Sequence, residues 1–174
     1  MRTRNIVGIG LFAFGLISYV VTQHFSFAAD KPHSGFVHAS IEFIRDLSIR
    51  VESRSVSVPK DIDSPERLRR ASGNYDAMCA TCHLKPGVSQ SELSKGLYPT
   101  PPNLTQTRDR SDAASDFWVV KHGIKGSGMP SWGKVGLTDD EIWDLVAFIR
   151  NMPTMDSRSY ANYVKTGLGH HHSH

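Results

Sequence analysis

The sequence predicts a mainly helical fold, and three observations support this prediction. Apolar residues recur at helical spacing between Val37 and Val51. Ser64, followed by a proline and a glutamate, has the residue order of an N-cap, a first helical position and an acidic first turn. A second capped start, at residues 138–141, leads into a periodic apolar run that ends near Asn151. We therefore expect a mainly helical chain.

The N-terminal segment predicts export. Arg2 and Arg4 precede an uncharged apolar run of 17 residues, Ile6–Thr22. At about 1.5 Å per residue such a helix spans roughly 25 Å, slightly short of a bilayer core of about 30 Å. The run is long for a signal peptide, and the exit at Ser26–Ala29 is only a fair cleavage site, which favours a retained anchor over a cleaved signal. Residues 1–29 therefore predict an anchor or signal, with everything after it exported.

Charge and length limit the classes of protein that need be considered. The chain has 20 Lys and Arg against 17 Asp and Glu, a net charge of +3, and without Arg2 and Arg4 the counts are 18 and 17. Nucleic-acid binding needs a clustered basic surface, so we expect no nucleic-acid partner. The 145 residues after position 29 are enough for one domain with an appendage.

Composition divides the exported part into three segments. Residues 30–63 predict a juxtamembrane helix followed by a linker at Pro59–Asp61. The apolar face of that helix is expected to pack on the rest of the protein or to lie against the membrane surface. Residues 64–153 hold the chemistry, and residues 154–174 predict a flexible, His-rich tail.

The most specific motif is Cys79-Ala80-Thr81-Cys82-His83, because Cys-x-x-Cys-His is the attachment signature of a c-type haem. Two thiols on one turn can each form a thioether with a porphyrin vinyl group, and the adjacent imidazole can ligate iron. A redox dithiol or half of a zinc site would use the same cysteine spacing, but neither sequence context is present here. The chain has no other cysteine, so we expect one covalently attached haem c.

The sixth position of the iron decides between an electron carrier and a protein that binds ligands. Met129 stands in a loop where three glycines, starting with Gly123, let the backbone approach a cofactor. Met152 directly follows an amphipathic helix and is more typical of core packing, while Met155 lies in a polar segment. His122 is the imidazole competitor. We expect Met129 to be the distal ligand.

These motifs together resemble a single-haem class I cytochrome c domain. The resemblance covers residues 64–153 and rests on the attachment motif, the glycine-rich approach to Met129 and the closing helix at 137–150, in the family's order. It implies an all-α fold of three to five helices around one covalently bound haem, preceded here by the transmembrane or signal helix. It also implies iron held between His83 and Met129. The first and last helices of that fold cross, here through Ala71, Tyr75, Leu145 and Phe148.

The resemblance implies a single-electron carrier in a respiratory-type chain rather than an enzyme. Its partners would be redox proteins, such as an oxidase, a reductase or a dehydrogenase, on the periplasmic side of a bacterial inner membrane. The domain would be anchored there, or soluble in the periplasm if the signal is cleaved. The alternatives are a haem sensor or peroxidase-like enzyme with a displaceable sixth ligand, and a cytochrome coupled to copper handling through the tail.

Histidines elsewhere suggest further metal sites. His38 and Glu42 stand at i,i+4 spacing with His33 nearby, a spacing that is also common by chance. The tail carries a tract that could bind copper or another metal. Its members are His170, His171, His172 and His174.

Overall fold

A computed structural model describes residues 2–24, 26, 28–106 and 112–167. Within these ranges the regular elements are helices and no strand occurs, which confirms the predicted all-α class. The chain divides into two units, residues 1–42 and 43–174. The tail histidines lie outside the described residues, so the prediction that they bind metal stays a prediction.

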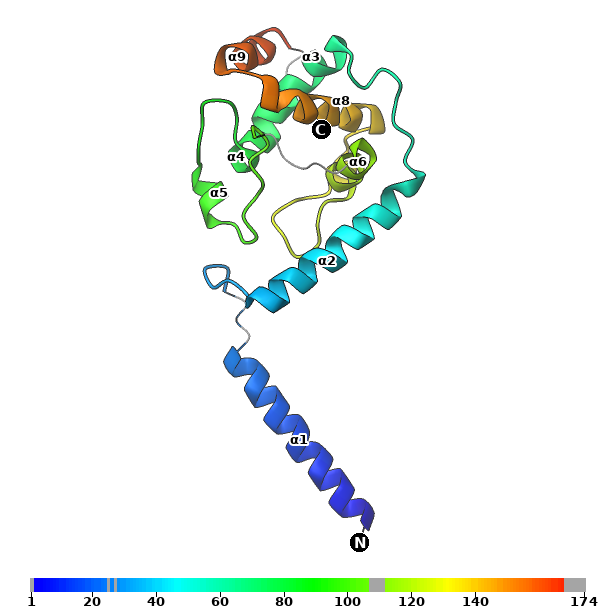
Figure 1. Cartoon of the computed structure of the whole chain (residues 1–174), viewed down its shortest axis with the longest axis vertical. Coiled ribbons are helices and arrows are strands. Elements are labelled where there is room, and N and C mark those ends of the chain that lie inside the picture. Colours follow the sequence, from blue (N-terminus) through cyan, green and yellow to red (C-terminus); the bar gives the residue numbers. More distant parts are fainter. Residues whose placement is uncertain (1, 25, 27, 107–111, 168–174) are drawn as a thin grey trace. The chain divides into compact units, whose positions relative to one another are not determined.

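Helix α1 (Arg2–His24) contains the predicted apolar run and is drawn at the blue end of the chain in Figure 1. Its large apolar side chains, from Ile6 to Val21, are exposed. Among the described residues, none of the helices combines the length and the apolarity that crossing a membrane requires.

Helix α2 (Gly35–Glu52) confirms the helix predicted from the apolar spacing after Val37. His38 Nδ1 lies 3.2 Å from Glu42 Oε2, so the spacing of these two residues produces an ion pair when the histidine is protonated. No group of three or more His, Cys, Asp or Glu that could hold a metal ion occurs in the part of the chain that the structure describes.

The segment after α2 belongs to the second unit and packs against it, so it is not a free linker. It begins with a 3-10 turn, η1 (Ser53–Ser55), in which the buried Ser53 Oγ lies 3.0 Å from the buried Ser115 Oγ. Ile62 packs against the hydrophobic core. The predicted linker at residues 59–61 is therefore held at both ends by contacts with the domain.

Three consecutive helical segments lead into the Cys-x-x-Cys-His motif. Helix α3 (Pro65–Asn74) starts where the sequence predicts, with Ser64 in the N-cap position. A π-helical turn, η2 (Tyr75–Cys79), follows, and α4 (Ala80–His83) completes the motif. From the sequence we expect this helix to run to about Ala77, whereas the α-helix gives way to the wider π turn after Asn74.

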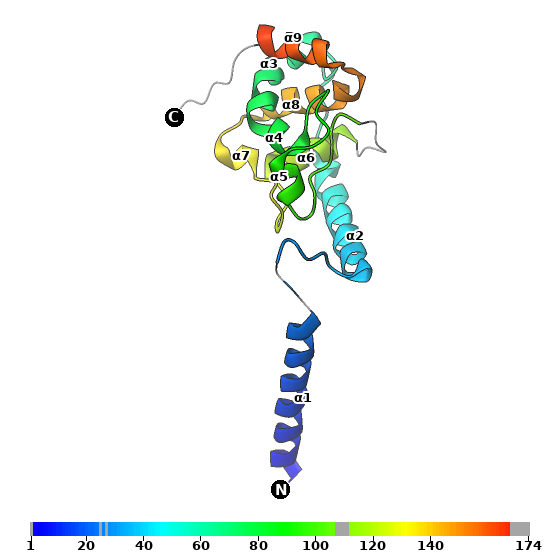
Figure 2. The same cartoon turned by 90° about the vertical axis from the view of Figure 1, so that its left-hand side faces the viewer.

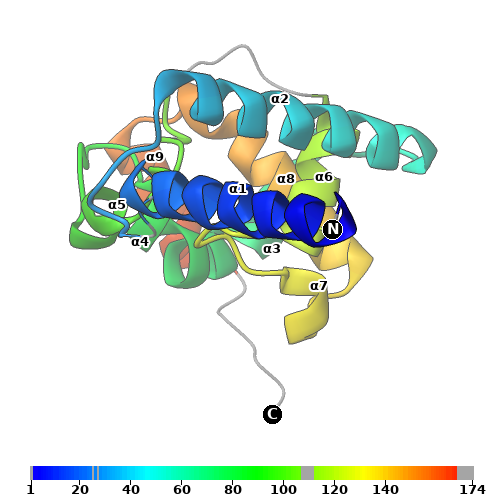
Figure 3. The same cartoon turned by 90° about the horizontal axis from the view of Figure 1, so that it is seen from below.

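Three short helices follow the motif: α5 (Glu92–Gly96), α6 (Ala113–His122) and α7 (Trp132–Val135). From the sequence we expect a short helix at Ser115–His122, and α6 begins two residues earlier. The sequence does not predict α5 and α7, since each is about one turn long and depends on a single serine cap, Ser91 or Ser131. Figure 3 shows α7 next to α6.

Helix α8 (Asp139–Asn151) closes the predicted domain and begins with the expected capping box. Thr138 Oγ1 accepts a hydrogen bond from the Glu141 N–H at 3.3 Å, and the Glu141 carboxylate accepts one from the Thr138 N–H at 2.8 Å. A 3-10 turn, η3 (Met152–Thr154), follows directly.

The prediction of a flexible tail from residue 154 is wrong over its first half. Residues Ser157–Thr166 form helix α9, and the carboxylate of Asp156 caps it by accepting from the Ser159 N–H at 2.7 Å. Tyr160 of this helix is buried. Figures 1 and 2 show α9 against α3, a contact that a mostly polar composition does not predict.

Helices α3 and α8 cross at the centre of the second unit (Figure 1). The four residues predicted for this crossing are all buried, with 0 or 1% of each exposed: Ala71, Tyr75, Leu145 and Phe148. The ring centroids of Tyr75 and Phe148 are 5.5 Å apart. The crossing therefore rests on the residues that the resemblance implies.

Buried ion pairs join the same two helices. Asp144 of α8 accepts from Arg67 Nη1 at 2.7 Å and from Arg70 Nε at 2.6 Å. Arg67 also donates to Asp61 and Asp140, at 3.1 and 3.0 Å. The side chains of Arg67 and Asp144 are only 6% and 4% exposed. Since a buried charge that loses its partner is costly, these pairs favour one register of α3 on α8.

Replacing Asp144 by Asn should lower the free energy of unfolding by about 3 kcal/mol, because two arginines lose a buried carboxylate. Asp139→Asn is the matched control on the same helix. Asp139 is 62% exposed and pairs with Lys121 at the surface, so its loss should cost less than about 1 kcal/mol. Urea denaturation measures both values, and equal losses would contradict the role given to Asp144.

Candidate functional site

The Cys79–His83 motif forms a tight turn. The Ala80 N–H donates to the Tyr75 carbonyl, five residues back, as in a π turn. Cys79 is buried, Cys82 is half-buried, and both are free thiols. Burial raises the pKa of Cys79 to about 12, so this thiol is neutral at physiological pH. Neither cysteine is tied up in a disulfide, so both sulfur atoms can form a thioether.

Tyr75 links the start of this turn to its end. Its hydroxyl donates to the Leu84 carbonyl at 2.7 Å, and both residues are buried. Leu84 has a φ of +66°, a left-handed backbone conformation that a side chain of this kind rarely adopts. The hydrogen bond from Tyr75 therefore stabilises an unfavourable conformation next to His83.

The ring of His83 is oriented by a proline carbonyl. His83 Nδ1 lies 2.9 Å from the Pro102 oxygen. Because a carbonyl only accepts, Nδ1 carries the proton and Nε2 carries the lone pair that can ligate a metal. The Leu104 N–H donates to the His83 carbonyl at 3.1 Å. The segment 102–104 thus holds both the backbone and the ring of His83.

The loop between α6 and α7 carries Met129. Gly123 has a φ of +69°, and a Cβ at this position would lie 2.7 Å from the Met129 oxygen, so a larger residue does not fit. The Ile124 N–H donates to the Met129 carbonyl at 3.2 Å, and Ser127 Oγ accepts from the Met129 N–H at 3.1 Å. Met129 itself is half-buried and packs against the hydrophobic core. The loop is therefore fixed by local bonds around this methionine.

The segment 84–106, which contains α5, contacts both the Cys-x-x-Cys-His motif and the loop of Met129. At one end, Ser91 Oγ donates to the Thr81 carbonyl inside the Cys-x-x-Cys-His motif. At the other, a Cβ at Gly128 would lie 2.9 Å from Leu97 Cδ2, so the residue before Met129 lies against the side chain of Leu97. This segment therefore connects the motif to the Met129 loop.

The competing ligands of the sequence analysis lie in other surroundings. Met152 is fully buried in the core, which confirms the packing role predicted for it. Met155 is half-buried and packs against the same core. His122 is exposed, with its ring centroid 5.0 Å from that of Trp118.

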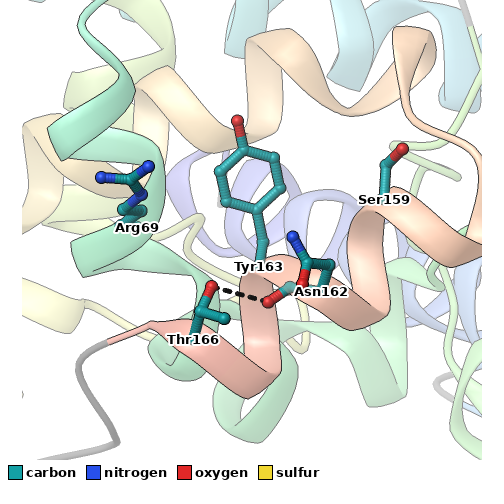
Figure 4. A pocket seen from close by; sticks show the side chains of 5 residues that line it. All are labelled: Arg69, Ser159, Asn162, Tyr163 and Thr166. Carbon is teal, nitrogen blue, oxygen red and sulfur yellow. Dashed lines mark hydrogen bonds between the residues drawn. The ribbon is translucent and has the colours of Figure 1, made fainter.

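A polar hollow of about 480 Å³ opens at the surface between α3 and α9 (Figure 4). Tyr163 and Arg69 face it from the two helices. None of the residues predicted to bind haem lines it. The lining residues are Arg69, Ser159, Asn162, Tyr163 and Thr166.

With this geometry in place, comparison with known proteins identifies the central segment. Residues 66–149 match the family model described as cytochrome C oxidase, cbb3-type, subunit III. The segment is a cytochrome c domain. Such a domain implies covalently bound haem c and a role as a haem-based electron carrier, and domains of this kind are typically exported. No curated protein matches the chain.

The residues of the cytochrome c domain suit haem c. Two free thiols lie three positions apart on one turn. The following histidine has its Nδ1 proton engaged by Pro102, which places the basic lone pair on Nε2. A half-buried methionine is held in a glycine-dependent loop. The donor set therefore contains two attachment points, an imidazole and a thioether, all of which can serve a haem c.

Several contacts and backbone features that hold this site could not be predicted from the sequence. Residues 102–104 resemble the proline segment that the family has near the proximal side of the haem, but the sequence does not show which carbonyl accepts the proton of His83. Leu84 has a positive φ angle, which no side-chain pattern in the sequence predicts. The contact of Ser91 with Thr81 joins residues ten positions apart across irregular chain. Each depends on tertiary geometry that spacing does not encode.

Replacing Tyr75 by Phe should lower the free energy of unfolding by about 2 kcal/mol, because the buried Leu84 carbonyl loses its donor. Tyr163→Phe is the control, since Tyr163 lines the surface hollow. Guanidinium denaturation of the two proteins gives the comparison. A Tyr75→Phe protein as stable as the control would show that the hydrogen bond to Leu84 contributes nothing.

Proposed function

We propose that this protein is a single-electron carrier that uses one haem c with His/Met axial ligation. Cys79 and Cys82 would form the two thioethers, and His83 and Met129 would be the axial ligands. The observation that supports this best is the hydrogen bond from His83 to Pro102 within the cytochrome c domain. It selects the tautomer whose Nε2 can ligate iron, and a partner of this kind typically orients a ligating histidine.

A haem held by an imidazole and a thioether supplies a one-electron Fe(III)/Fe(II) couple of raised potential with no vacant coordination position. The chain's own residues supply rigidity. Tyr75 fixes the end of the attachment turn, Pro102 fixes the ring of His83, and Gly123 permits the close backbone contact that shapes the Met129 loop. Groups that are already oriented need little rearrangement when the charge of the site changes, which favours fast electron transfer.

We place the domain on the periplasmic side of a bacterial inner membrane, tethered through the apolar run of α1. The support is the order of the N-terminal residues: Arg2 and Arg4, then an uncharged run at 6–22, then the cytochrome c domain. The partner would be a redox protein of a respiratory chain. Because the matching model describes an oxidase subunit, we favour a terminal oxidase over a reductase or a dehydrogenase.

Ferric haem with a methionine sulfur bound to its iron has a weak far-red absorption band. Met129→Ala should abolish this band, because it removes the proposed sixth ligand. Met152→Leu is the control, since Met152 is a core residue, and it should keep the band. Absorption spectra of the oxidised proteins decide the matter. Survival of the band in Met129→Ala would assign the ligand to another residue.

The same pair of proteins separates a carrier from a sensor or peroxidase-like enzyme. If Met129 holds the sixth position, the reduced wild-type protein should bind carbon monoxide slowly or not at all, while Met129→Ala should bind it at once. Stopped-flow mixing with carbon monoxide measures both rates. Rapid binding by the wild type would favour the sensor or enzyme over the electron carrier.

The intact mass of the protein from membranes should equal the 19.3 kDa chain plus one haem, even after denaturation, because the two thioethers are covalent and α1 is retained. Cys79→Ala/Cys82→Ala is the control and should lose the haem on denaturation. A mass short of residues 1–29 would show a cleaved signal. A wild-type mass without haem would contradict the proposed cofactor.

A further inference from the structure

Helix α9 lies outside the cytochrome c domain of residues 66–149. It nevertheless contacts the chain beside the turn that carries the Cys79–His83 motif, here called the attachment turn. Tyr160 is the buried residue of this helix, 4% exposed. Its ring lies 6.3 Å from that of Tyr75 and 5.9 Å from that of Phe148, measured between centroids. The side chain of Tyr160 therefore reaches the centre of the α3 and α8 crossing, immediately before the attachment cysteines.

The hydroxyl of Tyr160 joins a short polar network on this turn. It donates to Asp76 Oδ1 at 2.8 Å, and Lys85 Nζ lies 2.8 Å from the same oxygen. Asp76 precedes Cys79 by three residues, and Lys85 follows His83 by two. The lysine ammonium also lies 5.9 Å from the centroid of the Tyr160 ring. One carboxylate thus connects both flanks of the motif to α9.

A second contact joins α9 to the chain beyond the motif. Gly87 has a φ of +85°, and a Cβ there would lie 2.5 Å from Ser157 Oγ at the start of α9. Further along the helix, the Tyr163 carbonyl accepts from Ser72 Oγ of α3 at 2.9 Å. Helix α9 therefore contacts α3, the start of the attachment turn and the segment just after it.

The charge on Asp76 is maintained by its partners. Burial disfavours the carboxylate, but the hydrogen bonds from Lys85 and Tyr160 outweigh it and lower the pKa of Asp76. Burial and the neighbouring Asp76 raise the pKa of Tyr160, so the phenol stays protonated and acts as a donor. The network therefore has one arrangement of donors and acceptors at neutral pH.

We propose that Tyr160 is a positioning residue for the haem site: through Asp76 and Lys85 it holds the two flanks of the attachment turn and thereby helps to set the reduction potential. The inference rests on the proposed function, since it requires haem c on Cys79 and Cys82. Without the phenol, the flanks of the turn move more freely and admit more water to the His83 side. Greater solvent exposure stabilises the more highly charged ferric state.

The test is the reduction potential of the holoprotein with Tyr160→Phe, a change that removes one oxygen and no charge. At a fixed ambient potential set by a redox dye, the ferrous to ferric ratio should fall by about threefold relative to wild type. This effect is smaller than that of a group bonded directly to a ligand, because Tyr160 acts only through Asp76 and Lys85. Tyr163→Phe is the matched control from the same helix, since its ring lines the surface hollow in Figure 4, and it should leave the ratio unchanged.

Hydrogen exchange gives a second readout. The Leu84 and Val88 N–H groups donate to Ala80 and Lys85 within the held segment. Their exchange should be about tenfold faster in Tyr160→Phe, while the amides of α6 keep their wild-type rates. An unchanged ratio and unchanged exchange at Leu84 and Val88 in Tyr160→Phe would overturn the inference.

Should Tyr160→Phe be recovered without haem, Asp76→Glu takes its place. It keeps the charge but moves the acceptor by one methylene, and the ratio should fall in the same direction. An unchanged ratio would again overturn the inference. Absence of haem from the wild-type protein would overturn the proposed function itself, and this inference with it.

Discussion

The crossing of α3 and α8 is the constraint on which the rest of the second unit depends. Its apolar part is a contact between fully buried side chains, with Tyr75 against Phe148, and its polar part is the buried carboxylate of Asp144 between two arginines. The apolar contact supplies most of the stabilisation, since burial is roughly proportional to area removed from water. The ion pairs act differently, because they penalise every register that separates Asp144 from Arg67.

The position of the site follows from this crossing. Helix α3 leads through the π turn directly into the attachment motif, so the register of α3 on α8 also places Cys79 and His83. The loop that carries Met129, the proposed second ligand, follows α6, a helix that packs on α8 as well. Two segments about 46 residues apart in the chain therefore share one framework. The segment between them, which contains α5, contacts the attachment motif through Ser91 and the Met129 loop through Leu97.

Much of this could be predicted from the sequence, because the signals are local. Capping residues and apolar periodicity marked the starts of α3 and α8, and the Cys-x-x-Cys-His motif marked the cofactor class. The residues of the crossing came from the family resemblance. The partners of Asp144 and the carbonyl that orients His83 could not be predicted, since they pair groups far apart in the chain. Helix α9 was missed because three apolar or aromatic residues in a polar segment are a weak signal, although Tyr160, Tyr163 and Val164 all pack against the core.

We propose that His83 and Met129 are the two axial ligands of one haem iron. Proton NMR of the ferrous holoprotein, with its methionine methyl groups isotopically labelled, tests it most directly. A methyl group bound at the iron lies over the porphyrin ring and is shifted far upfield by the ring current. The account predicts one such methyl, and predicts that it disappears in Met129→Leu but persists in Met152→Leu and Met155→Leu. An upfield methyl that belongs to Met152 or Met155, or none at all, would contradict the account.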